Sequence, residues 1–332
     1  MTTLQTLLAE GRQYAPTFRN GLANHLPMAL IALDRLGATD DRLEGYYQHY
    51  RTRLEPFSAL DPDIWPEWSL ALGRAEAFPR FLAHFEAILA RDGRDRVLRD
   101  ALPHLMPGVC ASAFHALIRL AYGIRQGDEA EIAHALAYWA ADWQDLGPVQ
   151  TPSDRTPDQL LTERSAPFAD YRFGAGIIVD RMHEVSRHPD FVLGLQQPNR
   201  LDWDDLVRLA RRAFRDSGNF TILHGLTSLH AMWIIRPWLE QDDVALRYYW
   251  LAYLVAFIST RKPAPRPEPE AQPTIDPNQA RDWAMTRDDD HDIKLVYTCL
   301  DFHENADEAQ KPYWLATIER RIADQTADGT RI

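Results

Sequence analysis

Residues 107–124 read PGVCASAFHALIRLAYGI, a run that is apolar on nearly every side of a helix. A helix without a polar face belongs in the core of a protein. A second stretch of the same kind, NFTILHGLTSLHAMWIIRPWL, covers residues 219–239, and Pro237 is expected to end its helix. The sequence therefore predicts two fully buried helices around which the rest of the chain packs.

Helical signals also dominate the rest of the chain. Apolar residues recur every three to four positions, Pro27 suits the first turn of a helix, and Gly37 suits its end. No run alternates in the way that a strand requires, and no internal repeat of 20–50 residues stands out. We therefore expect an all-α fold, with residues 1–332 forming a single large multi-helix domain. Helices are expected at 2–14, 26–36, 40–54, 76–91, 107–124, 128–143, 173–188, 202–217, 219–239, 242–259, 289–303 and 308–324.

Two segments lack this pattern. Residues 147–170 are rich in Pro, Thr and Asp and indicate a long surface connection. Residues 261–280, RKPAPRPEPEAQPTIDPNQA, carry alternating prolines and favour an extended, non-helical conformation. This Pro-rich loop is either a lid over the functional site or a surface loop.

Composition restricts the partners. The chain has 48 acidic against 36 basic residues, a formal charge of -12, and no basic stripe, so we expect no nucleic acid and no anionic membrane among its partners. The most apolar run, 248–258, is far shorter than the ~20 residues that cross a bilayer. Cys110 and Cys299 both lie in apolar runs, and the N-terminus lacks the order of a signal peptide. A cytoplasmic protein is expected, and an acidic helical chain of this size could form a homodimer.

Four histidines and one lysine stand out, because each lies in a segment that otherwise indicates apolar helix: His25, His115, His224, His291 and Lys294. A polar residue is costly there unless something binds it. Neutral imidazole is the commonest metal ligand in proteins, so several that converge would form a metal site. The alternatives are a helix-capping role for His25 and a hydrogen bond in the core for His115.

Lys294 and His291 are three residues apart and therefore share one face of a helix. A lysine ammonium has no lone pair, so Lys294 could bind a metal only after deprotonation, or after reaction with CO2 to give an anionic carbamate. The ordinary alternative is an ion pair with Asp290, four residues earlier.

His224 and His230 lie six residues apart on one helix and point about 240° from each other. Only one of them can face a shared metal unless the helix breaks between them. We expect His224 to be the ligand, and His230 to be a catalytic group that lines the pocket or supports the ligands.

Other patterns are incomplete. Residues 173–180, FGAGIIVD, lack the third glycine of a dinucleotide-binding fingerprint. A di-iron site needs two Glu-x-x-His pairs, and only Glu131 and His134 form one. His183 and His188 have i+5 spacing, whereas a zincin needs i+4.

Four segments together resemble, in this order, recurring segments of the questin oxidase-like family: NHLPMALIALDRLGA, AFHALIRLAYGI, GNFTILHGLTSLHAMW and DDHDIKLVYTCL. The resemblance runs from about residue 16 to residue 304. It implies a helical non-haem iron oxygenase related to enzymes that oxidise anthraquinones and other polyketides, by Baeyer-Villiger-type oxygen insertion or by ring cleavage. Carried over, it implies that His25, His115, His224, His291 and carbamylated Lys294 bind Fe(II).

The partners would then be O2 and a small aromatic substrate, and the sequence leaves a need for NADPH open. Asp292 is expected as a further catalytic group, and Asn24, Asp290 and Asp292 as groups that orient the ligating rings. Four aromatic residues are candidates for a flat pocket, or for ordinary core packing: Trp233, Trp238, Tyr249 and Trp250.

This chain departs from the fungal members of the family in one position. Those members often carry a second histidine shortly after the first, and Met28 stands near that place here. Two other functions are compatible with the residues: a Zn(II)-dependent hydrolase that uses the same ligands, or a non-catalytic helical binding protein.

Overall fold

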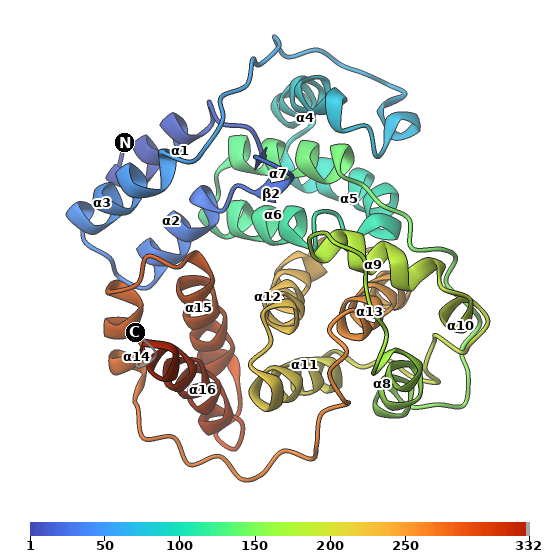
Figure 1. Cartoon of the computed structure of the whole chain (residues 1–332). Coiled ribbons are helices and arrows are strands. Elements are labelled where there is room, and N and C mark those ends of the chain that lie inside the picture. The colour runs from blue at the N-terminus through green and yellow to red at the C-terminus, as the bar shows by residue number, and fades with distance from the viewer. Residues whose placement is uncertain (330–332) are drawn as a thin grey trace.

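The computed structural model describes residues 1–329. The all-α fold expected from the sequence is confirmed (Figure 1). The α-helices of the described residues are α1 (Thr3–Gly11), α2 (Leu26–Arg35), α3 (Asp40–Arg51), α4 (Phe78–Asp92), α5 (Arg94–Leu105), α6 (His115–Gln126), α7 (Glu129–Ala141), α8 (Pro157–Ser165), α9 (Ile178–Arg187), α10 (Pro189–Val192), α11 (Trp203–Ser217), α12 (Phe220–Ile235), α13 (Asp242–Ile258), α14 (Pro277–Met285), α15 (Asp290–Asn305) and α16 (Lys311–Gly329). The two strands of a short antiparallel hairpin are β1 (Thr17–Phe18) and β2 (Leu22–Ala23).

Four helices form the centre of the molecule. Helix α2 packs against α6, α6 against α12, α12 against α15, and α15 against α2, so the four close a ring (Figure 1). Segments from both halves of the sequence therefore meet around one axis. This ring positions the functional site.

Helix α12 shows how the sequence produces this ring. It is apolar on all sides, and Asn219 starts it by accepting hydrogen bonds from the backbone N–H groups of Thr221 and Ile222. Gly225 allows α13 to lie close, because a Cβ at this position would stand 2.7 Å from the ring of Tyr253. A larger residue there would separate α12 from α13.

The remaining helices cover the ring. Helix α7 packs on α6 and α4 packs on α7, while α11 and α16 pack on α12 and α15, respectively. One cluster of buried side chains extends from Leu4 in α1 to Ile318 in α16. The ring helices and the helices that cover them thus share one continuous core.

The predicted helix over 107–124 was wrong in its first half. A 3-10 turn at Met106–Gly108 is followed by a tight reversal, and α6 begins only at His115. Three consecutive residues, Ser112, Ala113 and Phe114, have positive φ angles between 48° and 71°. L-residues adopt this left-handed region only at a cost, so neighbouring contacts must hold the reversal in place.

Further elements differ from the sequence-based expectation, among them α10 and α14, neither of which was predicted; α14 begins within the 261–280 segment that was expected to be non-helical. Helix α5 was not predicted and follows α4 after a break at Gly93, whose φ is 77°. Helix α8 lies inside the expected surface connection over 147–170, and the hairpin at 17–23 was not foreseen. Short strands of two residues leave no alternation for a sequence pattern to detect.

The Pro-rich segment is extended until α14 begins at Pro277. It is fastened to α11 and α16: Glu268 accepts from Arg211 at 2.8 Å, and Thr274 donates its backbone N–H to Glu319 at 2.6 Å. None of its residues lines the histidine-containing cavity described below. The structure therefore supports the surface-loop alternative for this segment.

No helix within residues 1–329 combines the length and the apolar character that crossing a bilayer requires.

Candidate metal centre

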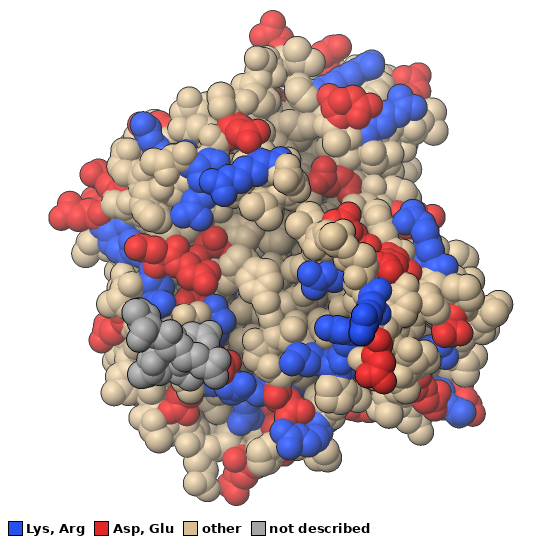
Figure 2. Space-filling model, viewed as in Figure 1, with Lys and Arg blue, Asp and Glu red and all other residues tan. Residues whose placement is uncertain are grey.

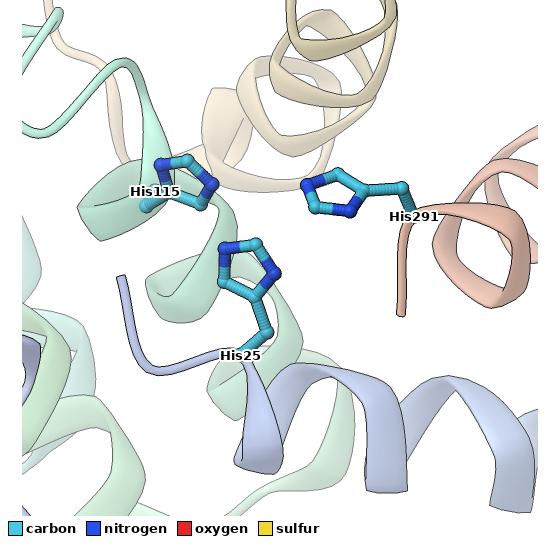
Figure 3. Close-up of side chains that lie close together, drawn as sticks. All are labelled: His25, His115 and His291. Atoms are coloured by element: carbon cyan, nitrogen blue, oxygen red, sulfur yellow. The ribbon is translucent and has the colours of Figure 1, made fainter. Parts of the chain in front are cut away.

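The four candidate histidines meet at one end of the helix ring. His25 immediately precedes α2, His115 is the first residue of α6, His224 lies in the second turn of α12, and His291 is the second residue of α15. Ligand atoms of His25, His115 and His291 all lie within 4.8 Å of one another, and Figure 3 shows their rings converging from three helices. The Nε2 atom of His224 is 3.2 Å from that of His115.

Each of the four rings is held by its Nδ1 atom. In two rings the Nδ1–H group donates to a backbone carbonyl: His115 to Ser112, and His224 to Phe220 at 2.8 Å. The Nδ1 atom of His25 meets the Oδ1 atom of Asp290. The Nδ1 atom of His291 lies 3.1 Å from Asp289 Oδ1 and 3.0 Å from Asp290 Oδ1.

This arrangement fixes the tautomer of the rings. A carbonyl or carboxylate oxygen only accepts, so Nδ1 carries the proton, and Nε2 of a neutral ring presents a lone pair. The Nε2 atoms of His115 and His224 then face each other as two acceptors. The Nε2 atom of His291 is buried and has no partner in the described structure.

Facing lone pairs and an orphaned buried nitrogen are unfavourable unless a cation lies between them. Ligating histidines commonly donate their other ring N–H group to a carbonyl or carboxylate, as all four do here. The residues present thus fit a metal ion. Imidazole donors suit iron, zinc, copper and nickel, so the donor set does not select one metal.

Burial keeps most of these rings neutral. It lowers the pKa of His25 to about 4, and it lowers the pKa values of His115 and His224 well below the ordinary value. Burial also lowers the pKa of His291, but nearby carboxylates, chiefly Asp290, outweigh it and shift the pKa upward. Neutral imidazole is the form that binds a metal.

Asp290 lies at the centre of the polar contacts. Besides its contacts with His25 and His291, its Oδ1 atom lies 3.4 Å from Nζ of Lys294. Lys294 is buried, its Nζ atom is 3.3 Å from Nδ1 of His25, and burial lowers its pKa. The structure thus brings Lys294 to the edge of the cluster, with the ion pair to Asp290 that the sequence allowed.

A cavity of approximately 540 Å³ opens beside the cluster, within the size range of small-molecule sites. Figure 2 shows a hollow near the middle of this face, between α2, α9 and α12. All four histidines and Asp290 line the cavity, whereas Lys294 does not. Most of the apolar wall comes from Phe18, Leu22, Ile177, Ile178, Val179 and Phe220.

The cavity also receives the N-termini of five helices. Residues at the start of α2, α6, α9, α12 and α15 all line it. The N-terminus of a helix carries a partial positive charge and unpaired N–H groups. The backbone of these five helices therefore contributes positive potential where the four histidines meet.

The structure does not bring His230 to this cluster. Its Nε2 atom lies 2.7 Å from Asp301, and its Nδ1 atom lies 3.4 Å from the hydroxyl of Thr298. Helix α12 is continuous, so His230 points away from the side of His224. His230 does not line the cavity.

Asp292 also lies apart from the cluster. It is fully buried and pairs with Arg321 at 2.6 Å and Arg287 at 3.2 Å. Asn24 caps α2 by accepting from the Leu26 N–H group, rather than contacting a candidate ligand ring. Of the three expected orienting groups, the structure places only Asp290 against the rings.

The expected aromatic pocket residues lie elsewhere. Tyr249 and Trp250 are buried in the core, while Trp233 and Trp238 line a different groove. The actual walls were not foreseen and include Tyr50, Arg53 and Arg181. The FGAG segment, rejected as a nucleotide motif, supplies part of the wall through Gly176. No spacing rule links these residues, because they come from separate elements.

Comparison with known proteins identifies the family. The questin oxidase-like family model matches residues 22–202, a range that contains His25 and His115. The Baeyer-Villiger oxidase AgnL3 of Paecilomyces divaricatus is 29% identical over 178 residues. That match covers 49% of this chain and 36% of the relative, so the similarity spans about a third of the relative's length. Because the family model matches more than half of the chain, the protein belongs to the questin oxidase-like family.

Proposed function

We propose that this protein is a non-haem Fe(II)-dependent oxygenase that oxidises a small aromatic, polyketide-like molecule. Membership in an oxidase family and similarity to a Baeyer-Villiger oxidase support oxidoreductase chemistry. The observation that carries the proposal is the set of four imidazoles, each held at Nδ1 by an oxygen acceptor, with ligand atoms that converge beside an apolar cavity.

In this proposal His25, His115, His224 and His291 hold the metal. When bound, Fe(II) supplies the one-electron chemistry that activates O2 for reaction with an organic substrate. The Asp290 carboxylate and the carbonyls of Ser112 and Phe220 orient the rings. Fixing a ligand through its second nitrogen strengthens metal binding.

The chain's other residues act on the substrate. The walls formed by Phe18, Ile177 and Phe220 accept a flat aromatic ring and exclude water from the face that reacts. Two reactions agree with the family: insertion of one oxygen atom next to a carbonyl, or cleavage of a ring C–C bond. Insertion of a single oxygen atom requires two further electrons, from the substrate or from a reductant such as NADPH.

Carbamylation of Lys294 remains part of the proposal. The side chain is buried, and burial lowers its pKa, which increases the fraction of neutral amine that reacts with CO2. A carbamate would add an anionic oxygen next to His25, which lies 3.3 Å from Nζ. Asp290 already places one negative charge there, so the ion pair is the direct competitor.

Elemental analysis of the purified protein beside the His291→Ala variant tests the metal site. We expect iron close to stoichiometric with the chain, and its loss in the variant. Oxygen uptake with hydroxyanthraquinones, measured with and without NADPH, then tests the reaction. Stoichiometric zinc that persists after anaerobic loading with Fe(II) would favour a hydrolase, and absence of any metal would contradict the oxygenase proposal.

A further inference from the structure

Two arginines line the same cavity as the histidines and have no carboxylate partner among the side chains that the structure describes, those of residues 1–325. Arg53 follows α3, and Arg181 lies in the first turn of α9, so they approach the cavity from separate elements. Arg53 stacks on the ring of Tyr50, with its Cζ atom 4.5 Å from the ring centroid. The Arg181 guanidinium donates only a long contact of 3.4 Å to the carbonyl of Gly176.

In lacking a carboxylate partner, Arg53 and Arg181 differ from the larger part of the arginines that the structure describes in this chain. Its formal charge is -12, and most of its arginines with described contacts pair with Asp or Glu. The stacking of Arg53 on Tyr50 holds the guanidinium plane in place without using its donors on a carboxylate. The Nη2 atom of Arg53 lies 3.2 Å from Nε2 of His49, and its other N–H groups have no acceptor among the residues that the structure describes. Both Arg53 and Arg181 therefore keep N–H donors available for an external acceptor.

The charges around the cavity do not balance. Asp290 is the only carboxylate among the described residues that line the cavity, and it is paired with His25 and Lys294. The cavity therefore carries an excess of positive charge from Arg53 and Arg181. The partial positive charges of the five helix N-termini increase this excess. A bound divalent metal would increase this excess further.

We propose that Arg53 and Arg181 select a substrate that carries an anionic oxygen, a carboxylate or an ionised phenol, on a flat apolar ring. The inference rests on the proposed function, since it names the class of substrate for that site. The apolar walls accept the ring, and the two guanidinium groups bind the anionic oxygen, a geometry to which Arg is well suited. The anion also offsets the charge that the cavity otherwise leaves uncompensated.

Equilibrium binding to a matched pair of probes tests this assignment. Anthraquinone-2-carboxylate and anthraquinone-2-carboxamide share one ring system and differ in charge, and titration calorimetry on the anaerobic protein as purified compares them. We expect the carboxylate to bind about tenfold or more tightly than the amide. Arg53→Gln and Arg181→Gln should each remove most of that preference.

Matched controls separate this effect from general changes in surface charge. Arg51→Gln and Arg187→Gln remove exposed arginines of α3 and α9 that do not line the cavity, and both should keep the preference. Equal affinity of the wild-type protein for the two probes would overturn the proposal. So would an unchanged preference in both Arg53→Gln and Arg181→Gln, provided that circular dichroism shows all variants to be folded.

A third probe distinguishes the two anionic oxygens. The affinity of 2-hydroxyanthraquinone, measured on both sides of its phenol ionisation, should rise on ionisation if the arginines bind a phenolate, and this rise should vanish in Arg53→Gln. If the affinity for 2-hydroxyanthraquinone does not change on ionisation, the anionic oxygen that the arginines bind is that of a carboxylate. These experiments measure binding without turnover, so they test the role of the two arginines separately from the proposed oxygenase activity. A protein that consumes no oxygen can still prefer the anionic probe, and an active oxygenase can still lack that preference.

Discussion

The Nε2 atoms of His115 and His224 lie 3.2 Å apart, although each ring donates its Nδ1–H group to a backbone carbonyl. Both inner nitrogens are therefore acceptors in the neutral state, and burial keeps both rings neutral by lowering their pKa values. Two acceptors at this distance repel each other unless a proton or a metal ion lies between them.

His224 and His230 provide the sharpest test of the ligand set, because both are buried on α12 and only His224 reaches the cluster. We expect His224→Gln to lose stoichiometric iron and His230→Gln to retain it, as measured by elemental analysis. His230→Gln should instead lower the melting temperature, since it leaves Asp301 without its histidine partner. Iron lost from His230→Gln but kept in His224→Gln would reverse the assignment.

Variants of Asp290 and Asp292 distinguish a carboxylate that orients the candidate metal ligands from one that stabilises the fold. Asp290→Asn should weaken metal binding about 10- to 100-fold, because the amide no longer accepts with full charge from His25 and His291. Asp292→Asn should leave metal affinity unchanged and destabilise the fold by about 3 kcal/mol, because Arg321 and Arg287 lose their buried partner. Competition with a chelator and chemical denaturation measure the two effects.

Carbamylation of Lys294 can be observed directly. Protein equilibrated with 13C-bicarbonate should give a carbamate carbon signal in the NMR spectrum that is absent from Lys294→Met. Lys311→Met is the control, since Lys311 pairs with Glu308 on the surface. A wild-type spectrum without this signal would leave Lys294 as the ion-pair partner of Asp290.

Buried neutral histidines should make the protein sensitive to acid. Burial, together with the charges of Arg119 and Arg12, lowers the pKa of His134 well below 6.5. The unfolded chain therefore binds more protons than the folded chain below pH 6.5, and the free energy of unfolding falls as the pH falls. Each such histidine contributes about 1.4 kcal/mol per pH unit in this range.

His134→Leu removes this group at a site away from the candidate metal centre, where its ring lies among Phe57 and Phe78. We expect the variant to lose stability less steeply between pH 6.5 and 5 than the wild type does. Urea denaturation at a series of pH values measures the slope. If the free energy of unfolding fell with the same slope in both proteins, the pKa of His134 would not be lowered by folding.

The sequence alone determined the fold class and the candidate ligands. Runs without a polar face require burial, which predicted the central helices, and a histidine in such a run is costly unless it is bound. Helical geometry separated His224 from His230, because six residues turn the chain by about 240°. These are local properties, so they can be deduced from neighbouring residues.

Only the tertiary structure decided what surrounds the ligands. The reversal before His115 depends on three residues with positive φ, which contacts from elsewhere in the fold hold in place. The cavity walls come from a hairpin, a loop and five helix N-termini, and Arg53 and Arg181 both line the cavity although 128 positions separate them in the sequence. Such proximity results from the way that helices pack and close a ring, and no periodicity within one segment encodes it.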